Sequence, residues 1–377
     1  MNMALSEEQA QLKELAAKAT KQIISPIVEK DEEEGIFRRE VIAELGKLGL
    51  TGIPTPAEYD GAGLGYLEYT LALEEIATAS VAYAVSVAVS GLPQIILNLF
   101  GSKEQKEKYV PPLARGEHIG AFSLSESHSG SDAASLKTRA VKRGNEYILN
   151  GTKLWTTQGN VADTAIVFAR TGAEGARGVS AFIVEKGTPG FRAGKLEHKM
   201  GINISPTCEL ILEDVKVPSS NLVGQEGMGF RIAMTALDSG RITIGASAVG
   251  LGRAALEYCV QYARGRKQFD QAIIDFQGIQ FMLADMYTSL EASRLLVRQA
   301  ATLKDLGKPF TREAAAAKLF ATDSTMRITT DAVQVLGGVG YTKEYPVERY
   351  MREAKVMQIV EGTNQIQRLV IGRSLSS

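Results

Sequence analysis

One carboxylate near the C-terminus stands in a setting that could make it a base. Glu361 follows the apolar pair Ile359 and Val360 and precedes Gly362, just before a predicted helix. Burial among apolar neighbours raises a carboxyl pKa toward the range of a general base, and a glycine lets a substrate approach the backbone. The alternative is an ordinary glutamate at a helix end before a glycine cap, and these residues alone leave both interpretations open.

A second candidate is the segment 121–132, in which hydroxyl-bearing and small residues are concentrated. Such a segment offers many backbone N–H and hydroxyl donors with few bulky side chains, which suits a pyrophosphate or the edge of a flavin. Its plainer interpretation is a solvated Ser/Gly-rich linker. Trp155, the only tryptophan, is either a core anchor or a platform for an aromatic cofactor, with the hydroxyls of Thr156 and Thr157 beside it.

Other kinds of site have little support in the sequence. His118, His128 and His198 are far apart and lack metal-ligand spacing, so we expect no metal site and no histidine-based triad. Cys208 and Cys259 form no CxxC pair, which favours a reducing compartment. The 42 Lys+Arg and 43 Asp+Glu nearly cancel and no long basic run occurs, so nucleic-acid binding is not expected.

The elements that must position these residues change character twice along the chain. The hydrophobic period is helical up to about residue 117, strand signals dominate from about residue 120, and the helical period returns after residue 226. We therefore predict three domains, at residues 1–118 (helical), 119–225 (β) and 226–377 (helical bundle).

Within these blocks the pattern predicts individual elements. Apolar runs predict strands at residues 164–168, 179–184 and 208–217. Residues 147–149 and 154–157 flank Asn150-Gly151, which is typical of a type I′ β-hairpin turn. The helical period predicts long C-terminal helices at about residues 226–265, 277–306 and 311–336.

Two further segments bear on location. Ser6-Glu7-Glu8-Gln9 is typical of a capping box that opens the first helix, so we expect no signal peptide and a cytoplasmic protein. Residues 76–102 carry no charge and have the length of a bilayer span, but polar residues, Gly91 and Pro93 interrupt them. We interpret this segment as a helix break inside a large core, not as a membrane span.

Six motifs taken together are far more specific than any one of them. They are Phe122-Ser123-Leu124-Ser125-Glu126 with Gly130-Ser131-Asp132, Trp155-Thr156-Thr157, Leu237-Asp238-Ser239-Gly240-Arg241, Arg266-Lys267-Gln268-Phe269, Gln334-Val335-Leu336-Gly337-Gly338, and Glu361-Gly362-Thr363-Asn364-Gln365-Ile366-Gln367-Arg368. In their order and spacing the chain resembles the acyl-CoA dehydrogenases over essentially its whole length, and most closely the short-chain, butyryl-CoA type. The resemblance implies a multidomain α and β fold with an N-terminal helical domain, a central β-barrel-like domain and a C-terminal four-helix bundle.

The resemblance also implies a reaction. An FAD-dependent enzyme of fatty acid β-oxidation would convert a short- to medium-chain acyl-CoA into the trans-2-enoyl-CoA, with Glu361 abstracting the α-proton and flavin N5 taking the β-hydride. Electrons would pass to electron-transferring flavoprotein, and the enzyme would be a homotetramer built as a dimer of dimers. Isovaleryl and long-chain relatives place their base immediately before the arginine that matches Arg241. Here that position is Gly240, so the match assigns the base to Glu361.

The same resemblance assigns binding roles. The flavin half of FAD would contact Phe122, Leu124, Ser125, Gly130, Ser131, Trp155, Thr156 and Thr157. The adenine and pyrophosphate half, across a subunit boundary, would contact Arg266, Phe269, Phe276, Gln277, Gln334, Gly337 and Gly338. Thr363 and Gln365 would complete the cofactor site beside the catalytic loop. The acyl-CoA would contact Ser131, Asp238, Arg241 and Gly362.

Two departures from the family pattern concern substrate preference more than reaction type. Ser127-His128-Ser129 replaces the commoner Pro-Gly-Ala, and Val360 stands where many members have Tyr. The first could alter hydrogen bonding in the flavin loop, and the second could widen the acyl pocket for a branched chain. Two different functions compete with dehydrogenation: an acyl-CoA oxidase, which is usually a much longer chain, and a flavin-binding or assembly paralogue without turnover, against which the presence of Glu361 argues.

Overall fold

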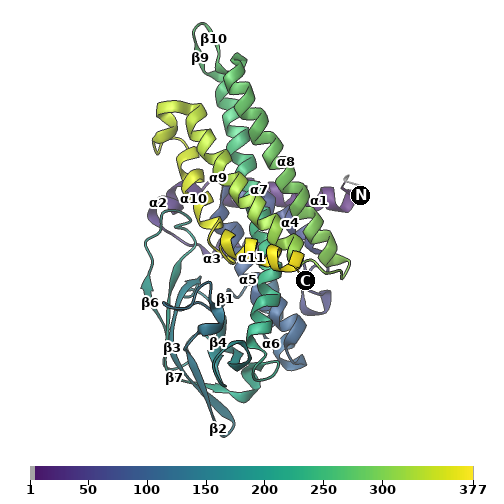
Figure 1. Ribbon diagram of the computed structural model, residues 1–377, viewed down its shortest axis with the longest axis vertical. Coiled ribbons are helices and arrows are strands. Elements are labelled where there is room, and N and C mark those ends of the chain that lie inside the picture. The colour runs from purple at the N-terminus through teal and green to yellow at the C-terminus, as the bar shows by residue number, and fades with distance from the viewer. Residues whose placement is uncertain (1–4, 377) are drawn as a thin grey trace.

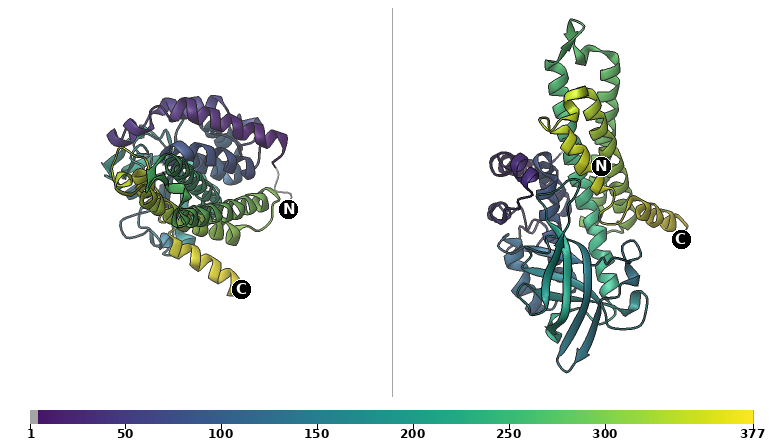
Figure 2. Two further views of the ribbon diagram at one scale, coloured as in Figure 1. Left: turned by 90° about the horizontal axis from the view of Figure 1, so that it is seen from above. Right: turned by 90° about the vertical axis from the view of Figure 1, so that its left-hand side faces the viewer.

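Helices from both ends of the chain lie together on one side of a β-sheet that is formed by the middle of the chain (Figure 1). The computed structural model describes residues 5–376. Along the long axis, the long C-terminal helices extend into one half of the molecule and the sheet occupies the other, where α6 lies beside it (Figure 1 and Figure 2). The predicted fold class, helical, then β, then helical, is confirmed.

The N-terminal helices are α1 (Glu7–Ala19), α2 (Val28–Glu34), α3 (Arg39–Lys47), α4 (Tyr66–Ala79), α5 (Val81–Phe100) and α6 (Lys103–Ala114). The predicted capping box is present at the start of α1, where Ser6 Oγ accepts from Gln9 N–H and Gln9 Oε1 accepts from Ser6 N–H. Each end of the pair satisfies a backbone donor that would otherwise lack a partner.

The C-terminal helices are α7 (Gly229–Gly265), α8 (Gln277–Asp305), α9 (Thr311–Leu336), α10 (Val347–Met357) and α11 (Asn364–Ser376). The three longest, α7, α8 and α9, pack against one another, and α4 from the N-terminal part packs on α7 and α8. Asp305 at the end of α8 accepts the backbone N–H groups of Tyr66 and Leu67 at 2.7 and 2.9 Å, which caps α4 with a negative charge. The N-terminal part is thereby tied to the bundle.

The middle of the chain forms one eight-stranded sheet in the order β6-β7-β3-β2-β4-β5-β8, with β1 paired in parallel to β4. The strands are β1 (Gly120–Ser123), β2 (Arg139–Arg143), β3 (Glu146–Thr157), β4 (Thr164–Arg170), β5 (Val179–Glu185), β6 (Phe191–Leu196), β7 (Thr207–Pro218) and β8 (Leu222–Val223). A separate two-stranded hairpin, β9 (Lys267–Gln268) and β10 (Gln271–Ala272), projects at the far end of the bundle (Figure 1).

The predicted turn at Asn150-Gly151 is wrong. These residues lie inside the continuous strand β3, where the pairing with β7 shifts register between Leu149 and Gly151. Asn150 binds Asp214 on β7 through its side chain instead of turning the chain. The chain instead turns at Gly144, which lies between β2 and β3 and has a φ of 61°. The extra residue lies on β7, where Glu213 and Asp214 together face Asn150, and Asp214 has a φ of 49°.

The charge-free segment belongs to the core. It forms the end of α4 and all of α5, separated at Ser80, whose Oγ caps α5 by accepting from Tyr83 N–H at 3.2 Å. The helix break is therefore at Ser80, whereas Gly91 and Pro93 lie within α5. The helix Val81–Phe100 is long and apolar enough to cross a membrane, but 83% of its most apolar window is buried inside the protein.

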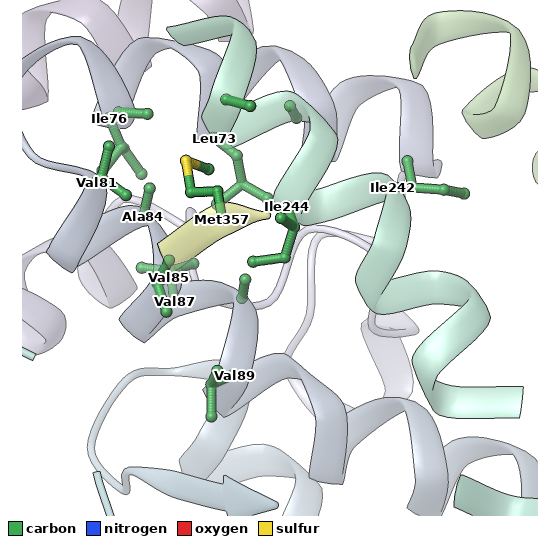
Figure 3. Packing of buried hydrophobic residues seen from close by; sticks show 14 of the residues in the cluster. Leu73, Ile76, Val81, Ala84, Val85, Val87, Val89, Ile242, Ile244 and Met357 are labelled. Carbon is green, nitrogen blue, oxygen red and sulfur yellow. The ribbon is translucent and has the colours of Figure 1, made fainter. Parts of the chain in front are cut away.

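Apolar side chains of α4, α5, α7 and α10 meet in this core (Figure 3). Those labelled in the figure are Leu73, Ile76, Val81, Ala84, Val85, Val87, Val89, Ile242, Ile244 and Met357. Because Met357 is the last residue of α10, the core anchors the point from which the chain enters the Glu361 segment.

Candidate active site

Glu361 lies in a tight turn between α10 and α11. The φ angles of Glu361 and Gly362 are 55° and 89°, so two successive residues adopt the left-handed region. Glycine does so at little cost, but a glutamate in that conformation costs roughly 1 to 3 kcal/mol. The surrounding structure must therefore hold the turn in place.

Side chains from two helices bind the carbonyl groups of this turn. Gln367 on α11 donates through Nε2 to the carbonyl oxygens of Glu361 at 3.2 Å and Gly362 at 2.8 Å. Lys318 on α9 donates through Nζ to the same Gly362 oxygen at 2.9 Å. Asn364, the first residue of α11, binds Lys318 and Thr322 of α9. The turn is fixed from both sides.

The carboxyl group of Glu361 has a buried oxygen atom. Its Oε2 atom is buried and has no hydrogen-bond partner among the described residues. Burial raises the pKa of Glu361 to about 7, although the positive charges of Arg241 and Lys318 oppose the rise. A carboxyl with this pKa is partly ionised near neutral pH and can accept a proton, as a general base must.

Gly240 of α7 provides the space for that carboxyl. A Cβ atom at position 240 would lie 2.4 Å from Glu361 Oε2, so the carboxyl could keep this place only beside a residue without a Cβ. The adjacent Arg241 is 4% exposed, forms an ion pair with Asp238, and keeps its Nε atom buried without a partner in the described part of the chain. Asp238 also accepts from Thr311 Oγ1 at 2.6 Å. The positively charged Arg241 thus lies beside Glu361, and its Nε–H group is available to donate a hydrogen bond.

The backbone around Glu361 has donor capacity as well. Within residues 5–376, the Glu361 N–H has no hydrogen-bond acceptor, whereas the neighbouring Val360 N–H binds the Val356 carbonyl oxygen at 3.0 Å. An amide in this state can donate to an external oxygen atom. This is the property required of an oxyanion site.

The segment predicted to line a flavin is held rigidly by β3. Leu154 N–H donates to the Ser125 carbonyl oxygen at 2.9 Å, and the hydroxyls of Ser123 and Thr156 lie 3.0 Å apart. Thr156 is 1% exposed, so its hydroxyl points into this support and not outward.

A buried ion pair joins the same two segments. Lys153 Nζ lies 2.7 Å from Glu126 Oε1 and donates to the Leu124 carbonyl oxygen at 3.0 Å. Glu126 also accepts the backbone N–H groups of Lys137 and Thr138 at 2.6 and 2.9 Å. Burial lowers the pKa of Lys153 to about 8, while the charge of Glu126 opposes this. His128, the middle residue of the Ser127-His128-Ser129 departure, lies 3.5 Å from Glu126.

Trp155 is not a core anchor. Its side chain is 59% exposed and its φ is 59°, so the backbone is twisted in a way that presents an aromatic ring at the surface of the sheet. Gly130 and Ser131 are exposed as well, and Ser125 and Thr157 are half-buried. A bare aromatic surface next to free hydroxyl and amide donors suits the planar, polar-edged ring system of a flavin.

Within one chain, the structure separates the predicted cofactor residues into two sets. Arg266, Phe269, Phe276 and Gln277 lie at or near the β9–β10 hairpin, at one end of the long axis (Figure 1). Gln334, Gly337 and Gly338 lie where α9 ends and are exposed. The loop after β1 and Trp155 lie on the sheet, in the other half of the molecule. Thr363 and Gln365 follow Glu361 directly and are half-buried and exposed, respectively.

The sequence reasoning missed the residues that support the site. Lys318, Lys153 and Gln367 are each fully buried, yet each is a polar residue bound to backbone carbonyl groups. Lys318 carried a usable signal, because it is spaced four residues from the buried Ala314 and Thr322 on the inner face of α9. In the described residues, no group of His, Cys, Asp and Glu is arranged to hold a metal ion.

Comparison with known proteins agrees with the motif pattern. Models of the acyl-CoA dehydrogenase N-terminal, middle and C-terminal domains match residues 6–117, 121–215 and 227–376. The short-chain specific acyl-CoA dehydrogenase of Clostridium acetobutylicum is 44% identical over 98% of both chains. The solved structure of butyryl-CoA dehydrogenase from Megasphaera elsdenii is 45% identical, with a TM-score of 0.98 over the full length of both chains.

A further structure, described as the electron transferring flavoprotein of Acidaminococcus fermentans in work towards a mechanism of flavin-based electron bifurcation, contains a similar chain. It is 48% identical with a TM-score of 0.98, over 100% of this chain and 99% of the other. Full-length identity at this level, together with three consecutive domain matches, places the chain in one family. The chain belongs to the acyl-CoA dehydrogenases.

Proposed function

We propose that this FAD-dependent acyl-CoA dehydrogenase oxidises a short- to medium-chain acyl-CoA to the trans-2-enoyl-CoA, with Glu361 as the base. FAD, when bound, accepts the β-hydrogen with its electron pair. The observation that carries the proposal is the buried Glu361 carboxyl, whose unpartnered oxygen occupies the space above Gly240 in the described part of the chain.

The residues of this chain account for removal of the α-proton. That proton is weakly acidic, so its loss needs both a base and a place for the negative charge that develops on the thioester oxygen. Glu361 supplies the base, since its raised pKa makes it a stronger proton acceptor than an exposed glutamate. The unbound N–H of Glu361 supplies a donor for the oxygen. Removal of the proton from Cα and of the hydride from Cβ leaves a double bond between these two carbon atoms.

Two groups of residues, which share Ser131, are proposed to bind the flavin and the acyl-CoA. Trp155, Thr157 and the loop from Phe122 to Ser131 would hold the flavin, while Ser131, Asp238, Arg241 and Gly362 would face the acyl-CoA. The short-chain preference is supported by the identity with butyryl-CoA dehydrogenase. In a panel from C4 to C16 acyl-CoA with a dye acceptor, kcat/KM should be highest for the short chains. A steady rise toward C16 would contradict the short-chain preference but not the reaction.

We further propose the domain division at residues 1–118, 119–225 and 226–377, a cytoplasmic homotetramer, and electron-transferring flavoprotein as the acceptor. The similarity to a chain in the Acidaminococcus fermentans structure supports such an acceptor. The separation of the Arg266–Phe269 set from the Trp155 set within one chain supports a cofactor site that two subunits share.

Replacing Glu361 tests the proposal directly. Glu361→Gln should keep FAD and the fold but slow flavin reduction by butyryl-CoA about 10²- to 10⁴-fold, the usual contribution of a general base. The measurement is anaerobic bleaching of the flavin absorbance after rapid mixing.

Glu353→Gln is the matched control. Glu353 is also buried, and burial raises its pKa to about 7, but it pairs with Arg349 on α10. In the Glu353→Gln enzyme the flavin should be reduced at nearly the normal rate. If the flavin of Glu361→Gln is also reduced at the normal rate, another residue must be the base.

A further inference from the structure

A lysine stands in the buried face of α9, directly beneath the turn that carries Glu361. Lys318 is 0% exposed and is surrounded along the helix by buried alanines. Its Nζ atom donates to the Gly362 carbonyl oxygen at 2.9 Å and to Asn364 Oδ1 at 2.8 Å. Neither acceptor is a carboxylate, so neither fully compensates for placing an ammonium group away from water.

The charged groups around Lys318 come from four elements. Glu361 in the turn and Asp323 on α9 attract its ammonium group, and Arg241 on α7 repels it. Arg368 on α11 lies 3.0 Å from Asp323 and neutralises part of that charge. Burial lowers the pKa of Lys318 to about 7 and raises that of Glu361 to about 7. Because Asp323 is already paired, Glu361 is the carboxylate left to balance Lys318.

Lys318 also acts on the backbone of the turn. The Gly362 carbonyl oxygen receives two donors, Lys318 Nζ and Gln367 Nε2, and the preceding residue is the left-handed Glu361. A strained conformation of this kind persists only when neighbouring groups over-determine it. Lys318 reaches the turn from α9, whereas Gln367 reaches it from α11, so the two donors fix its position relative to different helices.

We propose that Lys318 is a positioning residue for Glu361: its ammonium group holds the Glu361–Gly362 turn against α9 and provides the charge that keeps the nearby carboxylate ready to accept a proton. This inference rests on the proposed role of Glu361. It assigns to the bundle helix α9 a part in proton abstraction without contact to the substrate.

Two variants separate the hydrogen bond from the charge. Lys318→Met removes both, and Lys318→Gln keeps an N–H donor near the Gly362 oxygen while removing the charge. The matched control is Lys199→Met, since Lys199 is half-buried, burial lowers its pKa, and it donates to a backbone carbonyl oxygen, that of Ser205, at 3.0 Å. Each holoenzyme is assayed for FAD content, unfolding, and the pH dependence of kcat/KM and of flavin reduction with butyryl-CoA.

In the wild type, kcat/KM should rise with pH as Glu361 loses its proton near pH 7. Loss of the neighbouring cation should raise the pKa of Glu361, so in both Lys318 variants the acid limb should move upward by about 1 to 3 pH units. Lys318→Met should in addition reduce the rate at high pH by on the order of 10²-fold, as expected when a base is displaced by about 1 Å. Lys318→Gln should recover part of that rate, and KM should change little.

Four results would overturn the inference. One is an unchanged pH midpoint in flavin-loaded Lys318→Met, and another is a loss of rate that only matches a loss of FAD. If both Lys318 variants fail to fold or to retain FAD, Lys318 serves the fold alone. The Glu361→Gln enzyme is measured alongside: if it turns over normally, the proposed function fails, whereas an inactive Glu361→Gln with a normal Lys318→Met overturns only this inference.

Discussion

At the scale of single residues, the site depends on the absence of a side chain. Gly240 and Glu361 lie on different elements, 121 positions apart, yet the carboxyl of Glu361 fills the volume that a Cβ at position 240 would need. A side chain at position 240 would therefore force the Glu361 carboxyl out of its present place. The sequence alone identifies the two positions, but only the structure shows that they share one space.

Gly240→Ala tests this arrangement. The added methyl group should displace the Glu361 carboxyl and slow flavin reduction by about 10²-fold, because a misplaced base loses alignment with the α-proton. Stability should fall by only about 1 to 3 kcal/mol, as overpacking usually costs. The readout is rapid-mixing flavin reduction together with thermal unfolding.

Gly252→Ala on the same helix is the control. Its new Cβ would meet Thr325 Oγ1 at 3.2 Å, which is tight but tolerable, and none of its nearest neighbours belongs to Glu361. The helix should be preserved in both variants since alanine is the best helix former. Equal loss of rate in the two variants would point to a general disturbance of α7 and not to the carboxyl.

At the scale of elements, the connection between β1 and β3 determines where the proposed flavin surface lies. The buried Lys153–Glu126 pair, the Leu154–Ser125 hydrogen bond and the Ser123–Thr156 contact all cross from one segment to the other. Removing one partner of a buried ion pair leaves the other charge uncompensated. The loop that follows β1 is therefore expected to depend strongly on this pair.

Glu126→Gln should lower the free energy of unfolding by about 3 to 5 kcal/mol and speed release of FAD. The exposed pair Arg192–Glu213 on β6 and β7 offers the comparison, since Glu213→Gln should cost no more than about 1 kcal/mol and leave FAD binding unchanged. Chemical denaturation and flavin release by dilution measure the two effects. Similar losses in both variants would show that burial gives the Lys153–Glu126 pair no special role.

The elements differ in how far their sequence determines them. The helices α7, α8 and α9 agree with prediction to within a few residues, because each keeps one apolar face over many turns. Strand β6 was not predicted, because most of its side chains are exposed and show no alternation. The Asn150-Gly151 prediction was wrong because these residues continue β3 and pair with β7, a strand distant in sequence that carries the bulge.

The residues of the candidate site also differ in whether local sequence or tertiary contacts identify them. Apolar neighbours and a following glycine are local signals, so Glu361 could be proposed from sequence. Lys318, Lys153 and Gly240 depend on partners that only folding brings close. A local pattern identifies a group that can react, whereas the groups that tune it are set by tertiary contacts.

At the scale of the whole molecule, aromatic residues remain exposed at the end of the bundle away from the sheet. Phe269 in the β9–β10 hairpin is 89% exposed and Tyr341 after α9 is 87% exposed. Exposed aromatic side chains of this size are typical of binding surfaces. Their position fits the proposal that this end of one subunit contacts the cofactor of another.

Phe269→Ala should leave the unfolding of the chain nearly unchanged but weaken FAD retention and assembly by about 2 kcal/mol, as for an interface hot spot. Leu306→Ala at the opposite end of α8, where the side chain is 61% exposed, should affect neither. Light scattering and flavin absorbance across a dilution series report the two effects. A tetramer that keeps its FAD after Phe269→Ala would place the shared surface elsewhere.

The exposure of Trp155 has an optical consequence. Since the chain contains a single tryptophan, all of its indole fluorescence originates from this ring on the sheet. A flavin lying against the ring would quench the indole emission almost completely, whereas a flavin bound farther away would quench it only in part, because energy transfer weakens steeply with distance. The intrinsic fluorescence of the protein is therefore a direct signal of cofactor occupancy that needs no label and no turnover.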